Sequence, residues 1–592
     1  MDKKIKLTTQ EIKENIEALK KFMKKHNLEA FYVSSFDPYL GEYVPLEDCH
    51  RYYFTGFSGS VAEVLVPLEG KVRLYVDGRY HEQADLEVDL NEVEVIKCPM
   101  NKRNLEALQE DLLSLDPDLL GYEGERTPLS LERKFQESWN TLVFDEGELA
   151  QVVNFGKVEI SGKVHLLPKE VRCQETKEKL KRIFSAEEKE DEKQRAYFLT
   201  ALEDIAWVSN CRGYQLPNLS GFMSRALLTE KKVYIFIEEN CPLDMSIREN
   251  HQIEFIKGNR SLMKDKLGKL QNDFQFFKIY FDPNLINSAD YRLLSSIVGE
   301  KILEEKKGGL TEFRSLKTAE ELEQIQKSFD RSNSAIAKTI RWVREQYKNG
   351  KIISEIDFYE NCNRFYSEEP GYQGLSFTTI SAIGKNSSII HFGAPSHDVK
   401  AKSDDLMLLD SGGYFASGFA TDTTRSFLAG GQLGKASAKQ KEIYTLVLKS
   451  LLQVHMMTPK VGTIGKEVDL VARKPLLEKG YDYNHGTGHG VGVYVHEGGI
   501  NFGSKSETVL KAGQVVSVEP GIYIPGFGGV RLENIVIIEN HPNKENHFRF
   551  RPLVYIGFDS YLIDEDLLTP EEKTYLLNYE EECVKRGTSF LQ

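Results

Sequence analysis

The chain has 592 residues, of which 40% are hydrophobic, and a formal net charge of -14. This length exceeds what a single hydrophobic core normally serves, so we expect about three or four domains. The acidic balance argues against a nucleic acid or an anionic membrane surface as the main partner, because both bind clustered Lys and Arg.

Three features indicate a compartment. The seven cysteines are odd in number and show no C-x-x-C spacing, so a disulfide framework is not expected. Residues 1–27 have an amphipathic helical pattern with charges throughout, and they lack the apolar segment of a signal peptide. No run of about 18 apolar residues occurs, so no membrane span is expected. We therefore expect a cytoplasmic protein.

The first third of the chain alternates helical patterns with short apolar runs at 30–35, 60–67 and 71–78. Gly, Pro and Asp bound these runs, which is typical of strands in an α/β domain. Residues 197–210 and 224–238 repeat the pattern loosely. Two related α/β domains would explain the repeat.

Two segments are candidate boundaries. The charged stretch from Ala186 to Lys193 has few apolar residues, and a solvated helix face or loop inside the second domain is favoured there over a linker. The better boundary is Lys306 to Thr311 (KKGGLT), after which long helical patterns begin. Short strands and glycine turns follow from Ser376 onward. The predicted domains are 1–160, 161–312 and 313–592.

Two aspartates flank a predicted hairpin. In MLLDSGGYFASGFATDTTRSF, Asp410 ends an apolar run and Asp422 lies in the next extended segment. A β-hairpin would place them on neighbouring strands, about 5 Å apart. Two carboxylates that close repel each other, and one must bind a proton unless a cation lies between them. Taken alone, either aspartate is more simply a turn residue.

Two glutamates follow predicted strands. Glu519 comes after VVSV, and Glu533 lies in GVRLENIVII, where the two-residue period of a strand places Arg531 on the same face. A buried arginine there could orient a metal-bound carboxylate. The alternative for each glutamate is an exposed rim position.

Residues 484–498, NHGTGHGVGVYVHEG, carry His485, His489 and His496 on a glycine-rich segment. No G-K-[ST] follows, so a loop that lets histidines approach a ligand fits better than a phosphate loop. One histidine and four carboxylates can hold two divalent ions, which can activate water at neutral pH. An oxygen-rich ligand set favours manganese, with zinc, cobalt or iron as alternatives. The pattern predicts a metal-dependent peptidase.

The motifs IIHFGAP, LLDSG, TDTTRSF, HGTGHGVG, VHEG, VEPG and RLENI lie between about 316 and 560. They resemble the peptidase family of the pita-bread fold, which includes aminopeptidase P, prolidase, methionine aminopeptidase and creatinase. The whole chain is most similar to the long, three-domain Xaa-Pro aminopeptidases. FTGFSGS, VDGRY and TALEDIAWVSNCRG resemble their N-terminal domains, and 559–583 resembles their C-terminal extension. The implied fold is α/β (α+β), with two related creatinase-like N-terminal α/β domains followed by a C-terminal pita-bread catalytic domain.

The resemblance also implies roles for single residues. The metal ligands would be Asp410, Asp422, His489, Glu519 and Glu533, with Asp422 and Glu533 bridging two ions. A bridging hydroxide would attack the first peptide bond, and Glu519 would pass a proton toward the leaving proline nitrogen. Histidines of this family bind the substrate carbonyl and stabilise the charge that develops on it. The residues that match them are His391, His485 and His496. Arg531 is a further candidate for substrate binding.

In the family pattern the two aspartates are eleven positions apart, whereas Asp410 and Asp422 are twelve positions apart. The extra residue falls within GGYFASGFA, where a longer hairpin or a bulge could absorb it. A slip of one residue would turn a carboxylate to the wrong face.

The implied activity is removal of the N-terminal residue from peptides with proline in the second position, by a homodimer. A prolidase acting on Xaa-Pro dipeptides is the closest alternative, although prolidases are shorter and have one N-terminal domain. A binding protein that keeps the pita-bread fold without catalysis is a further alternative. Such a protein is expected to have lost metal ligands, whereas all five candidates are present here.

Overall fold

A computed structural model describes residues 6–99, 102–145, 147–185 and 194–590. The chain divides into two compact units, an N-terminal unit of Met1–Leu166 with Gln174–Leu310 and a C-terminal unit of Leu167–Cys173 with Thr311–Gln592. The division after Leu310 falls inside KKGGLT. The charged stretch 186–193 lies outside the described residues. Among the described helices, none has the length and apolar character needed to cross a membrane.

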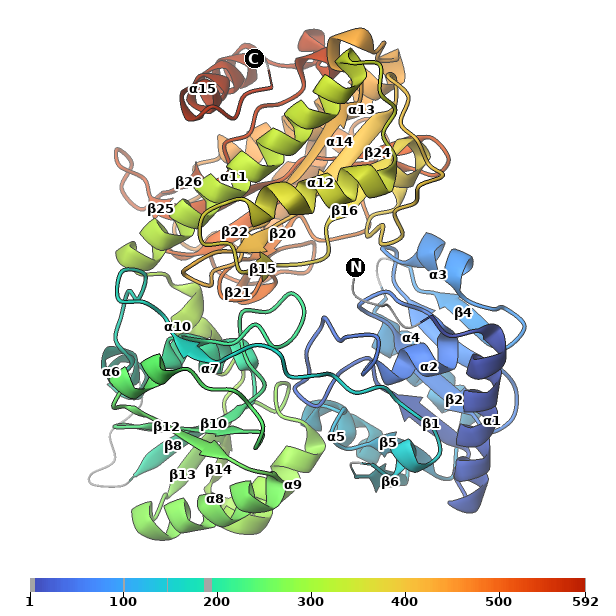
Figure 1. Cartoon of the computed structure of the whole chain (residues 1–592), viewed down its shortest axis with the longest axis vertical. Coiled ribbons are helices and arrows are strands. Elements are labelled where there is room, and N and C mark those ends of the chain that lie inside the picture. Colours follow the sequence, from blue (N-terminus) through green and yellow to red (C-terminus); the bar gives the residue numbers. More distant parts are fainter. Residues whose placement is uncertain (1–5, 100–101, 146, 186–193, 591–592) are drawn as a thin grey trace. The chain divides into compact units, whose positions relative to one another are not determined.

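The N-terminal unit contains two six-stranded sheets of the same topology, with strand orders β4-β3-β2-β1-β5-β6 and β12-β11-β10-β8-β13-β14 (Figure 1). In each sheet the first strand in sequence, β1 or β8, pairs antiparallel with one neighbour and parallel with the other. The shared topology confirms the two related α/β domains predicted from the sequence repeat. The first sheet consists of β1 (Ala30–Val33), β2 (Glu63–Pro67), β3 (Val72–Val76), β4 (Val93–Lys97), β5 (Leu120–Glu123) and β6 (Thr141–Phe144). The second consists of β8 (Arg195–Leu199), β10 (Arg225–Thr229), β11 (Val233–Ile237), β12 (Ile253–Lys257), β13 (Lys278–Phe281) and β14 (Leu303–Glu305).

Helices connect these strands. The first helix, α1, begins after Thr8, whose side chain and that of Glu11 cap each other's backbone N–H groups. Its apolar residues recur every three or four positions and are buried, which seats the helix on the first sheet. The helices of this unit are α1 (Thr9–Lys25), α2 (His50–Thr55), α3 (His81–Glu87), α4 (Asn104–Leu115), α5 (Leu129–Ser138), α6 (Thr176–Ser185), α7 (Leu202–Ser209), α8 (Arg260–Phe274) and α9 (Ser288–Val298). A short pair, β7 (His165–Leu166) and β9 (Cys211–Arg212), completes the unit.

The C-terminal unit contains a three-stranded sheet, β16-β17-β19, and a five-stranded sheet, β21-β20-β22-β25-β26. Two short antiparallel pairs, β15-β18 and β23-β24, accompany them. The strands are β15 (Gly374–Leu375), β16 (Ile380–Ile383), β17 (Leu406–Asp410), β18 (Gly413–Tyr414), β19 (Thr424–Leu428), β20 (Gly488–Gly490), β21 (Glu497–Phe502), β22 (Val515–Val518), β23 (Gly521–Ile524), β24 (Gly528–Arg531), β25 (Asn534–Asn540) and β26 (Phe548–Pro552). The helices are α10 (Thr311–Ser315), α11 (Ala319–Lys348), α12 (Glu355–Ser367), α13 (Ala438–His455), α14 (Gly465–Leu477) and α15 (Pro570–Arg586).

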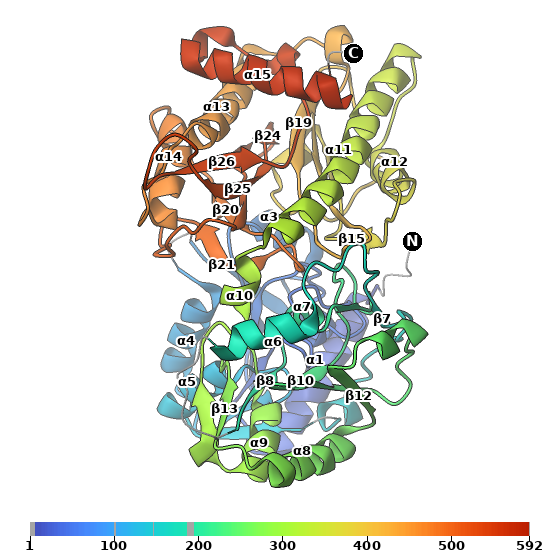
Figure 2. The same cartoon turned by 90° about the vertical axis from the view of Figure 1, so that its left-hand side faces the viewer.

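Helices cover these sheets on both sides. Figure 2 shows α13 and α14 on one side of β20, β25 and β26, and α11 and α12 on the other. Leu451 of α13 and Val468 of α14 share a buried apolar cluster with Val516 and Val536 of the five-stranded sheet. On the other sheet, the ring of Phe358 in α12 meets that of Phe427 edge-on at 6.0 Å. The strands between the helix layers are therefore held on both faces, and their ends provide fixed positions for side chains.

Candidate metal centre

The hairpin that carries the two aspartates has a continuous register. Asp410 at the end of β17 faces Thr424 of β19. Beyond this pair, Ser411 N–H donates to the Thr423 carbonyl (3.1 Å) and the Tyr414–Ala420 bridge extends the ladder. The ladder therefore keeps one register up to the turn 415–419, without a bulge between the aspartates, and Asp422 lies two positions along the chain from the residue that faces Asp410.

Gly412 makes this close hairpin possible. A Cβ atom there would lie 1.9 Å from the carbonyl oxygen of Thr421 and 2.5 Å from Ser376 Oγ. We expect Gly412→Ala to lower the free energy of unfolding by about 1–3 kcal/mol, the usual cost of overpacking, in urea titrations. Gly374→Ala in neighbouring β15 is the matched control, since no atom lies within 4 Å of its Cβ position. Equal losses in the two variants would contradict this account of the hairpin.

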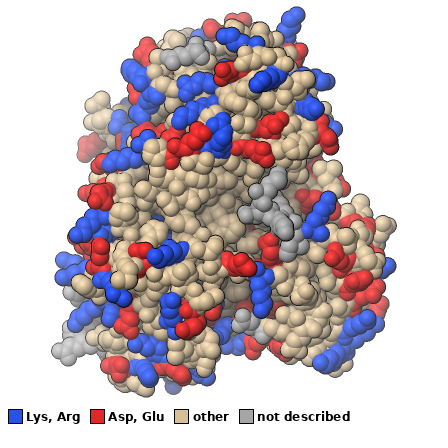
Figure 3. All heavy atoms as spheres, in the orientation of Figure 1, with Lys and Arg blue, Asp and Glu red and all other residues tan. Residues whose placement is uncertain are grey.

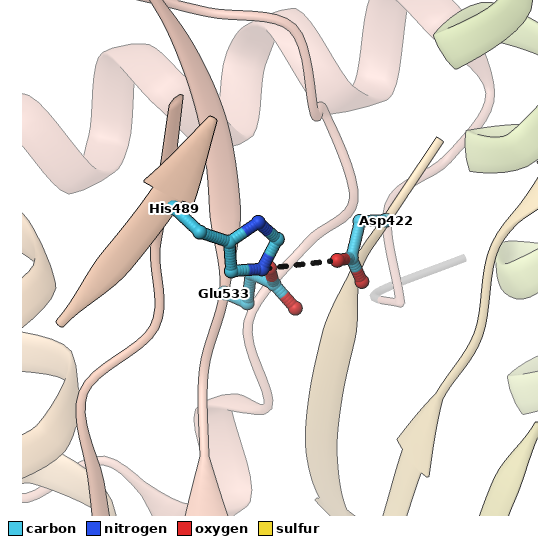
Figure 4. Close-up of side chains that lie close together, drawn as sticks. All are labelled: Asp422, His489 and Glu533. Atoms are coloured by element: carbon cyan, nitrogen blue, oxygen red, sulfur yellow. Dashed lines mark ion pairs between the residues drawn. The ribbon is translucent and has the colours of Figure 1, made fainter. Parts of the chain in front are cut away.

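Side chains from β20, from just before β19 and from the link between β24 and β25 converge, as Figure 4 shows for His489, Asp422 and Glu533. One ligand atom from each of these three lies within 4.8 Å of the others. His489 Nε2 is 3.5 Å from Asp422 Oδ2 and 3.4 Å from Glu519 Oε1. Four of the five predicted ligands are thus in one cluster, and Asp410 joins it through the hairpin with Asp422.

The imidazole of His489 is oriented for this cluster. Its backbone N–H donates to Ser517 Oγ (2.9 Å), and its Nδ1 lies 3.1 Å from the carbonyl oxygen of Gly490. Because a carbonyl can only accept, this contact assigns the ring proton to Nδ1. The lone pair of Nε2 then faces the carboxylates, which is the tautomer that a metal ligand requires.

The buried carboxylates repel one another, and this raises their pKa values further. Burial, followed by repulsion from Glu533 and Asp410, raises the pKa of Asp422 well above its ordinary value. Burial and then the charge of Glu519 raise the pKa of Glu533, and burial raises that of Glu519 to about 7. In addition, Asp410 Oδ1 and Glu533 Oε1 are buried without a hydrogen-bond partner. Divalent cations would satisfy these oxygens and cancel the repulsion, so the residues present fit such ions.

Arg531 holds Asp410 from behind. Its Nη2 donates to Asp410 Oδ2 (2.6 Å), its Nη1 to Tyr523 Oη (3.0 Å), and its Nε to Thr424 Oγ1 (3.1 Å). The residue is only 2% exposed. This geometry favours the orienting role over the predicted contact with substrate, because the guanidinium is enclosed and its donors are engaged by the protein.

We expect Arg531→Met to lower the free energy of unfolding of the metal-free protein by about 3 kcal/mol, because it leaves a buried carboxylate without its cation. Chemical denaturation measures this loss. Arg549→Met removes the exposed partner of Glu539 and should cost under about 1 kcal/mol. A loss for Arg531→Met no larger than for Arg549→Met would show that the Asp410 pair is not important for stability.

The structure gives His485 a partner that was not predicted. Its Nε2 lies 2.9 Å from Tyr523 Oη, and its Nδ1 lies 2.7 Å from the Gly486 carbonyl oxygen. Burial raises the pKa of Tyr523 to about 12, so the hydroxyl keeps its proton and can donate. The arrangement favours orientation of Tyr523 by His485. Tyr523 was missed in the sequence, where its only signal is a place on the strand that follows VEPG.

The other two predicted histidines lie beside the cluster. The ring of His496 meets that of His489 edge-on, with centroids 4.5 Å apart. His391 follows Ile390, whose carbonyl accepts from Arg531 Nη1 (3.3 Å), so its backbone lies next to Arg531. Both residues are partly exposed.

Figure 3 shows charges of both signs mixed over the visible face of the C-terminal unit, with largely uncharged residues over the end that carries β15 and β20.

Family models match three consecutive parts of the chain. A model of metallopeptidase family M24 matches residues 323–540, and two models of the creatinase/prolidase N-terminal domain match 15–152 and 158–321. These matches define the class: a metallopeptidase domain preceded by two creatinase-type domains, as predicted.

Curated relatives cover the whole chain. A probable Xaa-Pro aminopeptidase P of Pyricularia oryzae is 30% identical and spans 97% of this chain and 96% of its own. One of Sordaria macrospora is 31% identical, over 98% and 96%. The chain belongs to the Xaa-Pro aminopeptidase P family of M24 metallopeptidases. It is a metal-dependent hydrolase that acts on peptides.

Solved structures agree on the fold. The X-prolyl aminopeptidase of Caenorhabditis elegans, described as a cytosolic enzyme with a di-nuclear active site, has a TM-score of 0.87 at 23% identity and covers 97% of this chain and 96% of its own. The Xaa-Pro dipeptidase of Bacillus anthracis has a TM-score of 0.52 at 25% identity and covers 65% of this chain and 98% of its own. Together with the family models, the first comparison confirms the predicted fold of two creatinase-type domains followed by a metallopeptidase domain.

Proposed function

We propose that this enzyme removes the N-terminal residue from peptides that carry proline in the second position. The observation that carries the proposal is the cluster around His489, in which Asp422, Glu519 and Glu533 meet one imidazole. Relatives named Xaa-Pro aminopeptidase P match this chain over nearly their whole length, which supports the same substrate class.

We propose two divalent ions, preferably manganese, with zinc, cobalt or iron as alternatives. Asp422 and Glu533 would be shared between the ions, Asp410 would complete one, and His489 with Glu519 would complete the other. The di-nuclear site named for the Caenorhabditis elegans protein supports this number. When bound, such ions lower the pKa of water and polarise a carbonyl group.

The remaining chemistry falls to the side chains of the chain. Glu519 would take a proton from the attacking water and return it to the leaving proline nitrogen. His391 and His496 would donate hydrogen bonds to the substrate carbonyl as negative charge develops there. The Tyr523 hydroxyl contacts Arg531 and His485 and would keep its proton there. Arg531 would keep Asp410 in its ligating orientation.

We also propose three domains, 1–160, 161–312 and 313–592, a homodimeric assembly and a cytoplasmic location. The two sheets of the N-terminal unit support the first division. The description of the Caenorhabditis elegans protein as cytosolic supports the location. Nucleic acids and membranes are not expected partners, because the net charge is -14.

Product analysis of metal-stripped enzyme, with and without Mn²⁺, tests this function on three peptides: Xaa-Pro-Yaa, Xaa-Pro and Xaa-Ala-Yaa. We expect Mn²⁺-dependent release of the first residue from the proline tripeptide and much slower cleavage of the other two. Faster cleavage of the dipeptide would establish a prolidase instead. If none of the three peptides were cleaved with any metal, a non-catalytic binding protein would be favoured.

A further inference from the structure

The two sheets of the C-terminal unit are joined at one buried arginine. Arg425 lies in β19, three residues after Asp422, and is fully buried. Its Nη1 donates to the backbone carbonyl of Glu533 (2.6 Å) and to that of Thr424 (3.0 Å). Glu533 N–H in turn donates to the Thr424 carbonyl (3.1 Å). The backbone segments next to Asp422 and at Glu533 are therefore hydrogen-bonded to each other and to the same arginine.

All the acceptors that Arg425 uses are neutral oxygens. Its Nη2 donates to Asn534 Oδ1 (2.8 Å), to the Ile556 carbonyl (2.9 Å) and to Tyr579 Oη (3.1 Å). Its guanidinium carbon also lies 4.7 Å from the ring centre of Phe558. A buried cation held by dipoles depends on their placement, because each lost bond leaves a buried donor of the guanidinium without its acceptor.

Tyr579 provides one of these dipoles and contacts Asn534, which provides another. It belongs to α15, in the C-terminal extension, beyond the part of the chain that the M24 model matches. Its hydroxyl donates to the Val554 carbonyl (2.8 Å) and accepts from Arg425 and from Asn534 Nδ2 (3.3 Å). Asn534 directly follows Glu533. One phenol hydroxyl thus contacts the side chain three residues after Asp422 and the side chain directly after Glu533.

The helix that carries Tyr579 is firmly docked. Thr569 and Glu572 form a capping box at its start, and Glu572 also pairs with Lys449 of α13 (2.7 Å). Tyr579 is buried, and its ring lies 5.1 Å from that of Phe558. The hydroxyl is therefore presented to Arg425 from a rigid element, which is what precise support of a site requires.

We propose that Tyr579 is a positioning residue of the metal centre, acting through Arg425 and Asn534 on the spacing of Asp422 and Glu533. The inference rests on the proposed ligand set, in which these two carboxylates are shared between the ions. It assigns the C-terminal extension a part in metal binding. Removing a residue that supports metal ligands in this way typically lowers metal affinity 10–100-fold.

The test is a calorimetric titration of metal-stripped, full-length protein with Mn²⁺, well below its unfolding temperature. Tyr579→Phe removes only the hydroxyl, and we expect about tenfold weaker binding. Tyr575→Phe is the matched control in the same helix, because the Tyr575 hydroxyl contacts His455 Nδ1 (3.2 Å) and not Arg425. We expect its Mn²⁺ affinity to stay within about twofold of wild type.

Arg425→Lys provides a second readout. It should weaken Mn²⁺ binding by more than tenfold, and adding Tyr579→Phe to it should have little further effect, because the two residues act in one network. Wild-type affinity in Tyr579→Phe, or an equal loss in Tyr575→Phe, would overturn the inference while leaving the ligand set intact. Failure of the wild-type protein to bind any of Mn²⁺, Zn²⁺, Co²⁺ and Fe²⁺ would overturn the ligand set and the inference together.

Discussion

Replacing Glu519 with glutamine is expected to lower kcat on an Xaa-Pro-Yaa tripeptide by about 10³-fold, within the range that general acid–base catalysis contributes. Glutamine keeps an oxygen for a metal ion and for Ser517 Oγ, which lies 3.2 Å from Glu519 Oε1. It cannot take up and return a proton. Product chromatography gives kcat and KM, and elemental analysis of the purified protein gives its metal content, which we expect to stay near that of wild type.

The control for this change is Glu539→Gln on β25. Glu539 pairs with Arg549 and Arg551 away from the ligand cluster, so kcat should stay within about twofold of wild type. If kcat of Glu519→Gln fell only in proportion to its metal content, Glu519 would act as a ligand without moving a proton. A loss below tenfold would contradict the assigned role altogether.

Replacing Asp422 with asparagine has opposite expected effects on activity and on stability. It removes a shared ligand, so we expect kcat/KM to fall by at least about 10⁴-fold, which corresponds to several kcal/mol of transition-state stabilisation. In the metal-free protein, however, the same change removes a buried carboxylate that repels Glu533 and Asp410. We therefore expect metal-free Asp422→Asn to be more stable than metal-free wild type by about 1–3 kcal/mol at pH 8.

The pH dependence of stability has the same cause. A carboxyl group whose pKa is raised in the folded state binds more protons there than in the unfolded state, so stability falls as pH rises through that range. Burial raises the pKa of Glu519 to about 7 and that of Asp422 well above its ordinary value. Thermal unfolding in EDTA should therefore show metal-free wild type losing stability from pH 6 to pH 8, with a shallower loss in Asp422→Asn.

Saturating Mn²⁺ should reverse the order of the two proteins, because a bound ligand stabilises the protein with the higher affinity more. Asp398→Asn, at an exposed position, serves as a control, and its stability should match that of wild type under all conditions. Greater stability of metal-free wild type at pH 8 than at pH 6, or a metal-free Asp422→Asn variant less stable than wild type, would contradict the electrostatic account of the cluster.

Short-range patterns predicted much of this molecule. The alternation of apolar runs and turn residues located β1, β2 and β3 of the first sheet, and the loose repeat at 197–238 overlaps β8 and contains β10 and β11 of the second. The hairpin between Asp410 and Asp422 followed from two extended segments and the glycines between them. Such features depend on neighbours along the chain, which a sequence displays directly. The roles of the ligands remain predictions, although the structure brings the residues together.

Long-range partners could not be predicted in the same way. Nothing near Tyr579 in the sequence indicates that its hydroxyl meets Arg425, 154 positions earlier. Likewise, the periodic pattern placed Arg531 on the face of Glu533 but did not reveal its contacts with Asp410 and Tyr523. These contacts are set by how separate sheets and helices pack, and a local pattern carries no information about that packing.

The most direct test of the central claim is anomalous X-ray diffraction at the manganese absorption edge, on crystals of the protein loaded with Mn²⁺. We expect two peaks per chain, both within ligand distance of Asp422 and Glu533, one also beside Asp410 and the other beside His489 and Glu519. A single peak, or peaks away from these five residues, would contradict the proposed two-metal centre.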